Sequence, residues 1–405
     1  MSENFVIVGA SHAAAMLAPS LRQHGWQGRI VVIGAEASIP YHRPPLSKDY
    51  LAGSKSLEEI LIRPAKVYEK SEVEFILETT VESINRDNKT VRLSNNETLP
   101  YDKLALTVGS NVRKVNLPGV DLDGVFYLRD LKDVERISAY ISPGASAVIV
   151  GGGYIGLETA AVLNRKGMKV TVLEMMERVL QRVTAPVLSE FYTRVHEEEG
   201  VSIRCGVGVT GFKGNGRVAK VLCSDGGEFA ADLVIIGVGI LPNTGLAEAA
   251  GLKVDNGIVV NAQAQTSDPD IFAAGDCTFH YNPVYERWVR LESVQNATDQ
   301  SRVVAGAACG KETSYNSVPW FWSEQFDLML QIAGLSQGYD EIITRGDPGE
   351  GRSFAAFYLS AGRVIAVDAV NKPQEFMFTK KLIPANREVN KTKLADVDAP
   401  IKELL

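Results

Sequence analysis

Cysteine is scarce in this chain of 405 residues, and its four cysteines lie far apart in the sequence. They are Cys205, Cys223, Cys277 and Cys309. No C-x-x-C or C-x4-C pair and no metal-ligand spacing occurs among them, so the sequence predicts neither a redox disulfide nor a bound metal. Few and unpaired cysteines are typical of a reducing compartment, and we therefore expect a cytoplasmic protein with reduced thiols.

Long apolar runs and an excess of positive charge are also missing. No apolar run approaches the ~18 residues that a membrane-spanning helix needs, so we expect no membrane insertion. The N-terminal MSENFVIVGAS enters a strand pattern without a basic or apolar leader, which predicts no signal peptide. The formal net charge of −7 argues against nucleic acid as the main partner. With 45% hydrophobic residues, the chain has the composition of a globular protein of two or three domains.

What the chain does contain is a complete dinucleotide-binding pattern at residues 147–174. An apolar strand runs into a G-x-G-x-x-G turn of Gly151, Gly153 and Gly156, a helix follows, and a second strand ends in Glu174. The first glycine permits the tight turn, the second lets a pyrophosphate approach, and the third lets helix and strand pack closely. Glu174 would accept the ribose hydroxyls and repel a 2′-phosphate, which favours NADH over NADPH.

A second copy of this pattern stands at residues 5–36. A strand leads to a turn with Gly9, Ser11 and Ala14 at the three key positions, and after a helix the next strand is followed by Glu36. Alanine is accepted at the third position, and serine is small enough for the second. Two nucleotide-binding units in one chain predict two bound nucleotides.

Two residues of this first turn each have two interpretations. The Ser11 hydroxyl could donate to a phosphate, or Ser11 could be a plain turn residue. His12 could flank the same phosphates, or it could have a purely structural role.

Further along the chain, three features bear on function. Residues 39–48 contain three prolines and two cations, which predicts a rigid loop. The stretch 266–276 delivers Asp276 after an apolar strand and a glycine, where it could accept a ligand hydroxyl or stand in an ordinary turn. The segment 292–310 has the pattern of a helix rich in small residues, and a strand-rich final domain follows it.

Residues 380–393 concentrate positive charge in an otherwise acidic chain. Five cations stand there against one acid, Glu388. The cations are Lys380, Lys381, Arg387, Lys391 and Lys393. We interpret this basic patch as a docking surface for an acidic partner or, alternatively, as a solvated tail.

Together these motifs resemble one family. The segments GASHAAA, PYHRPPLSK, LALTVGS, VIVGGGYIGLE, GVGILPN, IFAAGD and VPWFWSEQF are similar to those of the FAD-dependent, NADH-using ferredoxin reductases of oxygenase systems. The resemblance runs from Phe5 to about Val389. It implies an α/β, glutathione-reductase-like fold with two Rossmann-like nucleotide-binding domains and a small α+β C-terminal domain. FAD would bind residues 1–108 and 242–319, NADH would bind residues 109–241, and residues 320–405 would form the C-terminal domain.

The resemblance also implies roles for individual residues. For FAD, the first turn would face the pyrophosphate, Glu36 the adenosine ribose, Asp276 the ribityl chain and Val294 the pyrimidine ring. The full set expected at FAD is Gly9, Ser11, His12, Ala13, Ala14, Glu36, Arg43, Lys48, Arg129, Gly275, Asp276, Glu292, Ser293, Val294 and Trp320. The set expected at NAD is Gly151, Gly153, Tyr154, Ile155, Gly156, Glu158, Glu174, Gly237, Val238 and Gly239. Lys48, close to the flavin ring, and Glu158, close to the nicotinamide, are the residues to which the resemblance assigns a catalytic role.

The activity implied is electron transfer from NADH through FAD to a small one-electron carrier. That carrier would be a separate protein, a [2Fe–2S] ferredoxin that feeds an oxygenase, because this chain has no cluster ligands. Three alternatives stay open at the sequence level: a reductase of a small acceptor of the monodehydroascorbate or quinone type, an NADH-sensing flavoprotein that acts as an interaction module, and a Rossmann protein without flavin. The expected assembly is a monomer or a dimer.

Overall fold

The computed structural model describes residues 3–401, which form two compact units. The first unit comprises residues 1–42, 57–111 and 241–319, and the second comprises residues 43–56, 112–240 and 320–405. A two-stranded sheet of β8 (Ser110–Val112) and β17 (Ile240–Pro242) marks two of the places where the chain passes between the units. The partition into three domains that the sequence predicts remains a prediction.

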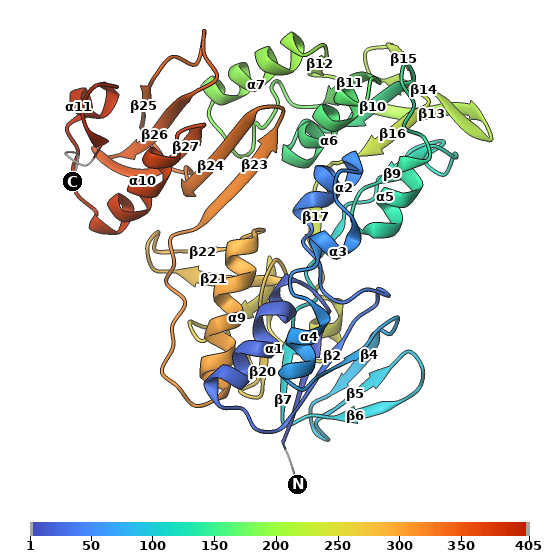
Figure 1. The fold of residues 1–405 in the computed structure, drawn as a ribbon, viewed down its shortest axis with the longest axis vertical. Helices are drawn as coiled ribbons and strands as arrows, with labels where there is room; N and C mark the ends of the chain where they lie inside the picture. The colour runs from blue at the N-terminus through green and yellow to red at the C-terminus, as the bar shows by residue number, and fades with distance from the viewer. Residues whose placement is uncertain (1–2, 402–405) are drawn as a thin grey trace. The chain divides into compact units, whose positions relative to one another are not determined.

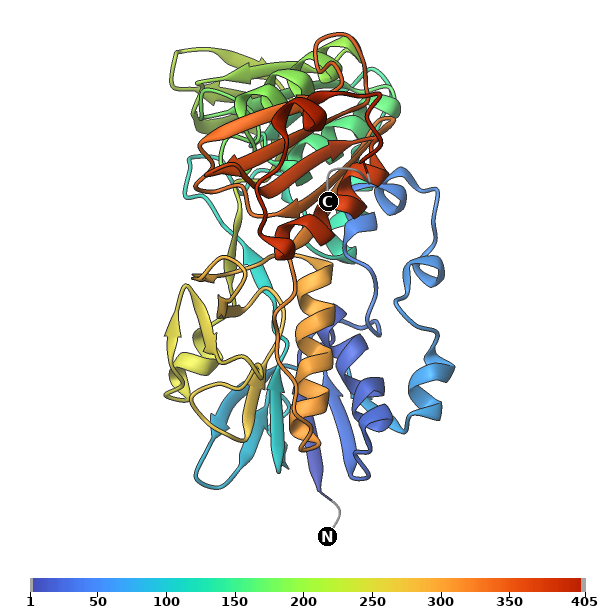
Figure 2. The same ribbon diagram turned by 90° about the vertical axis from the view of Figure 1, so that its left-hand side faces the viewer.

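The first unit is built on a parallel sheet of five strands in the order β20-β7-β1-β2-β3. The strands are β1 (Asn4–Val8), β2 (Arg29–Ile33), β3 (Val73–Ile76), β7 (Lys103–Leu106) and β20 (Ile271–Ala273). β1 and β7 are buried almost throughout, as expected for central strands covered on both faces. Helices α1 (His12–His24) and α9 (Val294–Ala308) lie side by side in both views (Figures 1 and 2).

Smaller elements complete the first unit. An antiparallel sheet contains β4 (Val81–Asn85), β5 (Thr90–Leu93) and β6 (Thr98–Pro100), and its second turn contains Ser94, Asn95 and Asn96. Another sheet contains β18 (Val254–Asp255), β19 (Gly257–Val260), β21 (Thr278–Asn282) and β22 (Arg287–Val289). The short helices are α3 (Leu57–Ile60), α4 (Ala65–Lys70) and α8 (Gly245–Ala249).

The second unit contains a second parallel sheet, in the order β12-β11-β10-β16-β9. Its strands are β9 (Val125–Tyr127), β10 (Ser146–Val150), β11 (Lys169–Glu174), β12 (Ser202–Cys205) and β16 (Leu233–Ile236). The accompanying helices are α5 (Leu131–Ser138), α6 (Tyr154–Arg165) and α7 (Pro186–Glu198). A three-stranded sheet contains β13 (Val209–Asn215), β14 (Arg217–Cys223) and β15 (Glu228–Ala230).

The last segment of the second unit is an antiparallel sheet in the order β23-β24-β27-β26-β25 (Figure 2). Its strands are β23 (Trp320–Gln325), β24 (Leu328–Gly334), β25 (Glu341–Arg345), β26 (Phe354–Ser360) and β27 (Arg363–Val370). Helix α10 (Pro373–Ala385) packs on β24 and β27, and α11 (Lys391–Ala395) packs on β25. The predicted fold class, two Rossmann-like domains and a small α+β segment, is confirmed.

The proline-rich loop of residues 39–48 is more regular than predicted. Its second half forms a 3-10 turn, η1 (Pro44–Ser47), followed by the short helix α2 (Asp49–Ala52). Pro44 stands at the first position of the turn, where its fixed φ suits the helical backbone and its missing N–H costs no hydrogen bond.

Within residues 3–401, no helix combines the length and the apolar character needed to cross a membrane.

Candidate functional site: two nucleotide-binding turns

The first nucleotide-binding turn connects β1 to α1 and fits tightly against the end of β7. Gly9 has a φ of +107°, and a Cβ on it would lie 2.5 Å from the carbonyl oxygen of Thr107. Only glycine fits this position, because any side chain would collide with the backbone. Ser11 is the N-cap of α1, but its hydroxyl donates to the Thr107 carbonyl at 2.9 Å instead of capping the helix. The side chain of Ser11 therefore leaves the first amide groups of α1 open to a ligand.

The end of β20 lies beside the start of α1. Gly275 has a φ of +91°, and a Cβ on it would lie 3.7 Å from the Cβ of Ala13. Its N–H donates to the side-chain oxygen of Gln300 on α9 at 2.8 Å. The next residue, Asp276, accepts a hydrogen bond from the hydroxyl of Ser110 at 3.1 Å. The structure thus brings Asp276 and the α1 turn, 262 residues or more apart in sequence, to the same end of the sheet.

Two contacts at this end of the first unit were not predicted from the sequence. The hydroxyl of Tyr41 donates to Glu36 Oε2 at 2.5 Å, so one oxygen of this predicted ribose ligand is already engaged. The rings of His12 and His42 approach with 3.1 Å between Nε2 and Nδ1. Both partners come from the proline-rich loop, which the sequence marked as rigid without indicating where it would fold back.

The remaining predicted FAD residues of the first unit lie at their expected elements. Ala14 is buried in α1, and Val294 is the first residue of α9. Ser293 caps α9 by accepting from the N–H of Asn296 at 3.1 Å, and Glu292 forms an ion pair with Arg290.

The second nucleotide-binding turn, between β10 and α6, repeats the geometry of the first. Gly151 has a φ of +111°, and a Cβ on it would lie 2.4 Å from the carbonyl oxygen of Gly237. A Cβ on Gly156 would lie 2.2 Å from the carbonyl oxygen of Gly151, so helix and strand approach closely. Gly153 differs, because a Cβ there would meet nothing within 4 Å. Open space at the middle glycine is what a pyrophosphate approaching the backbone requires.

Glu174 at the end of β11 is held in place by the backbone. Its Oε2 accepts from the N–H of Gly152 at 2.6 Å and its Oε1 from the N–H of Met176 at 2.8 Å. These charge-assisted bonds fix a negative charge beside the glycine turn. At the neighbouring end of β16, Gly237 donates its N–H to Val150, and the chain continues through Val238 to Gly239, which has a φ of +107°.

The side chains of Tyr154 and Ile155, at the start of α6, point in different directions. Ile155 is 48% exposed. The Tyr154 ring lies 5.0 Å from that of Phe321 on β23, and its hydroxyl is buried without a partner among the described residues. Tyr154 can therefore reach a nucleotide at this turn only through its backbone.

Lys48 and Glu158 form a buried ion pair within the second unit. Lys48 Nζ lies 2.6 Å from Glu158 Oε2, and the two side chains are only 12% and 4% exposed. The hydroxyls of Ser47 and Ser323 donate to the same carboxylate, each at 2.6 Å. Lys48 and Glu158, to which the resemblance assigns a catalytic role, are thus in direct contact, as a buried pair and not as a surface salt bridge. The two serines were missed, and no motif in the sequence marks them.

The other predicted FAD residues of this unit are Arg43, Arg129 and Trp320. Arg43 donates to the carbonyl oxygen of Arg129 at 2.8 Å, so the structure brings these two cations together. The Trp320 ring lies 4.9 Å below the ammonium of Lys380. Their roles at FAD remain predictions.

Both turns pass the test of whether a dinucleotide fits. In each, a glycine with positive φ lies against the backbone of a neighbouring strand, and the following helix has no side-chain N-cap bond. An acidic residue stands near the end of the adjoining strand in both copies. Backbone amides and the helix dipole can therefore receive a pyrophosphate at each turn.

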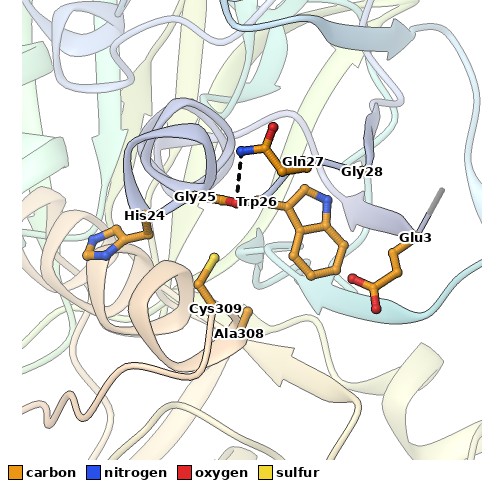
Figure 3. Close-up of a pocket in the computed structure, with 8 residues that line it drawn as sticks. All are labelled: Glu3, His24, Gly25, Trp26, Gln27, Gly28, Ala308 and Cys309. Carbon is orange, nitrogen blue, oxygen red and sulfur yellow. Dashed lines mark hydrogen bonds between the residues drawn. The ribbon is translucent and has the colours of Figure 1, made fainter.

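A hollow elsewhere in the first unit takes no part in this geometry. It lies at the C-terminal end of α1, opposite the glycine turn, and Trp26, Gln27 and Cys309 are among its lining residues (Figure 3).

Residues 3–301 match the family described as pyridine nucleotide-disulphide oxidoreductase, and residues 320–405 match the reductase C-terminal family. The chain belongs to the pyridine nucleotide-disulphide oxidoreductases. This oxidoreductase is 44% identical to putidaredoxin reductase from Pseudomonas putida over 100% of its length and 97% of the relative. It is 42% identical to ferredoxin–NAD(P)(+) reductase from a Sphingomonas species, over 99% of this chain and 97% of that one.

Solved structures agree with this family assignment. The oxidoreductase superposes on putidaredoxin reductase from its covalent complex with putidaredoxin with a TM-score of 0.96 and 44% identity, covering 99% of this chain and 98% of that one. A ferredoxin reductase from Rhodopseudomonas palustris gives a TM-score of 0.95 at 38% identity, covering 99% of both chains. The predicted membership in the ferredoxin reductase group is confirmed.

Proposed function

We propose that this chain is an FAD-dependent reductase that carries electrons from NADH to a [2Fe–2S] ferredoxin, which supplies an oxygenase. The observation that carries the proposal is similarity along the whole chain to ferredoxin reductases, in a protein with two nucleotide-binding turns. A cytoplasmic location is part of the proposal, and it is supported by four free cysteines.

The first unit holds FAD in this proposal. The amides at the start of α1 bind the pyrophosphate, with Gly9 and Ser11 shaping the turn. Asp276 and Glu36 are carboxylates that accept ligand hydroxyls. The domain boundaries at residues 108, 241 and 319 belong to the same proposal.

The second unit holds NADH. Gly151, Gly153 and Gly156 shape its turn, and Glu174 accepts from the ribose hydroxyls. A carboxylate held by two backbone amides cannot move away from a 2′-phosphate, so repulsion between the two charges persists. Glu174 is thereby the residue that selects NADH over NADPH.

FAD supplies the chemistry when bound: it accepts two electrons from NADH and releases them one at a time. What the chain itself contributes is a fixed positive charge. The Lys48 ammonium, buried and held by Glu158, stabilises negative charge near it more strongly than a solvated lysine would. Glu158 fixes the ammonium and neutralises it in part.

Disulfide chemistry, which the family name includes, has no support in this chain. All four cysteines are free. Burial raises the pKa of the Cys277 thiol to about 12, so this residue stays a protonated, unreactive thiol at neutral pH.

Stopped-flow spectroscopy of the purified flavoprotein tests the proposal. NADH should bleach the flavin absorbance rapidly, and the reduced protein should then pass single electrons to a [2Fe–2S] ferredoxin. Rapid reduction by NADH followed by transfer only to a quinone would contradict the assignment of the acceptor. Very slow reduction by NADH would instead favour the interaction-module alternative.

A further inference from the structure

The Glu158 carboxylate is oriented by three donors from two different segments. Its Oε2 faces Ser47 and Lys48, and its Oε1 faces the hydroxyl of Ser323 on β23, all at 2.6 Å. Glu158 is 3% exposed, so little water can replace a missing donor. Ser323 is the one side chain of the described residues seen to donate to Oε1.

Hydrogen bonds continue beyond Ser323 into the protein. The side-chain amide of Gln325 donates to Ser323 Oγ at 3.2 Å, and the Gln325 oxygen lies 2.8 Å from His196 Nε2 on α7. Ser323, Gln325 and His196 are at most 1% exposed. The carboxylate is thus the end of a buried chain of four polar side chains.

The Glu158 carboxylate fixes which group donates and which accepts in every hydrogen bond of this series. Ionised Glu158 can only accept, so Ser323 must donate to it and is left to accept from Gln325. The Gln325 oxygen then accepts from His196, which must carry its proton on Nε2. Burial lowers the pKa of His196 to about 4, and its Nδ1 has no partner within residues 3–401, in keeping with a neutral ring. Because all of these hydrogen bonds are donated toward the carboxylate, they polarise one another, and this strengthens the bond from Ser323 to Glu158.

The alternation of β23 explains how one strand supplies these contacts. Side chains two residues apart in a strand share a face. Phe321, Ser323 and Gln325 share one face and contact Tyr154, Glu158 and His196 in turn. Trp320 and Trp322 occupy the opposite face, where Lys380 lies over the Trp320 ring.

We propose that Ser323 is a positioning residue for the Lys48–Glu158 pair, supported by Gln325 and His196. The inference rests on the proposed function, in which this pair stands beside the reacting cofactors. The hydroxyl of Ser323 keeps Oε1 turned toward β23, and Oε2 is thereby kept turned toward the Lys48 ammonium.

The test compares Ser323→Ala with Ser323→Thr in the flavoprotein, by stopped-flow reduction with NADH. We expect Ser323→Ala to slow reduction at saturating NADH by about tenfold, the scale of one lost charge-assisted hydrogen bond. The concentration of NADH at half-maximal rate should stay unchanged. Ser323→Thr keeps the hydroxyl and should restore the rate.

A matched control removes another buried hydroxyl from the same segment. The Thr379 hydroxyl donates to the Glu375 carbonyl within α10, so Thr379→Val should leave the rate unchanged. If Ser323→Ala does not fold with full flavin, Gln325→Leu tests the same series of hydrogen bonds and should also slow reduction, but less.

Glu158→Gln separates failure of this inference from failure of the proposed function. If Glu158→Gln keeps the normal rate, the role proposed for the pair is wrong. If Glu158→Gln is slow while Ser323→Ala keeps the normal rate, only the inference is overturned. A Ser323→Ala variant that is slow and is not rescued by threonine has a structural defect and also overturns it.

Discussion

At the scale of single residues, we propose that Glu174 decides which coenzyme binds. Its carboxylate is fixed by the N–H groups of Gly152 and Met176 at 2.6 and 2.8 Å. We expect Glu174→Ala to lower kcat/KM for NADH by about tenfold, as for the loss of a hydrogen bond to a charged group, and to raise the NADPH value relative to it. Steady-state kinetics with both coenzymes measure this change.

The matched control is Glu177→Ala, which removes an exposed charge three residues away. Equal losses for both coenzymes in Glu174→Ala would contradict the assignment.

Asp276 is the second residue for which we propose a decisive role, in FAD binding. It follows Gly275, which approaches Ala13 at the start of α1, and it already accepts from Ser110. We expect Asp276→Ala to weaken FAD binding by about 1.5–3 kcal/mol, because a ligand hydroxyl loses a charged acceptor. Flavin content after gel filtration and titration of the apoprotein with FAD measure the loss.

The control variant Asp255→Ala, which removes an exposed carboxylate from the same unit, should retain its flavin. Unchanged affinity in Asp276→Ala would make Asp276 an ordinary turn residue.

At the scale of elements, strand β27 carries a carboxylate in the middle of a sheet. Asp368 is 1% exposed and accepts from the Tyr358 hydroxyl at 2.5 Å. Burial raises its pKa to about 7. Burial, and after it the charge of Asp368, also raises the pKa values of Tyr154 and Tyr192. The folded protein therefore holds a proton on Asp368 at a pH where the unfolded chain has lost it.

This raised pKa predicts that stability changes with pH. An aspartate in the unfolded chain has a pKa of about 3.9, so between about pH 4 and 7 the folded state binds more protons. Stability then falls as the pH rises through this range and levels off above the folded pKa. Asp368→Asn does not titrate, and we expect its melting temperature to equal that of the unmodified protein near pH 4 and to exceed it by several degrees at pH 8. Differential scanning fluorimetry measures the difference. A constant difference from pH 5 to 8 would show that Asp368 keeps an ordinary pKa.

At the scale of the whole molecule, a chain of net charge −7 needs a locally positive surface to attract an acidic partner, and the basic patch of residues 380–393 is the predicted one. One cation of the basic patch is already paired, because Lys391 forms an ion pair with Glu341 at 2.5 Å. Lys380 lies over the rings of Trp320 and Phe376, while Lys381 is exposed on α10. The docking role of this surface stays a prediction, and Lys380 and Lys381 are its centre.

We expect reversal of Lys380 and Lys381 to glutamate to slow electron transfer to the ferredoxin. The effect should be larger at low salt, because the screening length exceeds ~10 Å below 0.1 M. Reduction of the flavin by NADH should stay unchanged, and stopped-flow measurements at several salt concentrations separate the two steps. Lys66→Glu with Lys70→Glu on α4 is a control with the same change in net charge. If the variant with Lys380 and Lys381 reversed keeps the normal transfer rate and salt dependence, as the α4 control does, this surface is ruled out.

Local patterns in the sequence determined most of the architecture. The two βαβ units were predictable because glycine spacing and hydrophobic periodicity are properties of neighbouring residues. The helix after Gly153 and the acidic ends near β2 and β11 stand where these patterns predicted them. Helix α7 was not singled out, although Pro186 at its first turn is a signal that sequence reasoning could have used.

Only the tertiary structure decided how the ionisable groups are partnered. Ser323 is 165 residues from Glu158, and nothing in its neighbourhood predicts that it completes the carboxylate's hydrogen bonds. Tyr41 on Glu36 and Glu341 on Lys391 are contacts of the same kind. Such partners depend on which strand face packs against which helix, and therefore on the assembled core. The sequence by itself determined that this chain binds two nucleotides, and packing decided which side chains hold its buried charges.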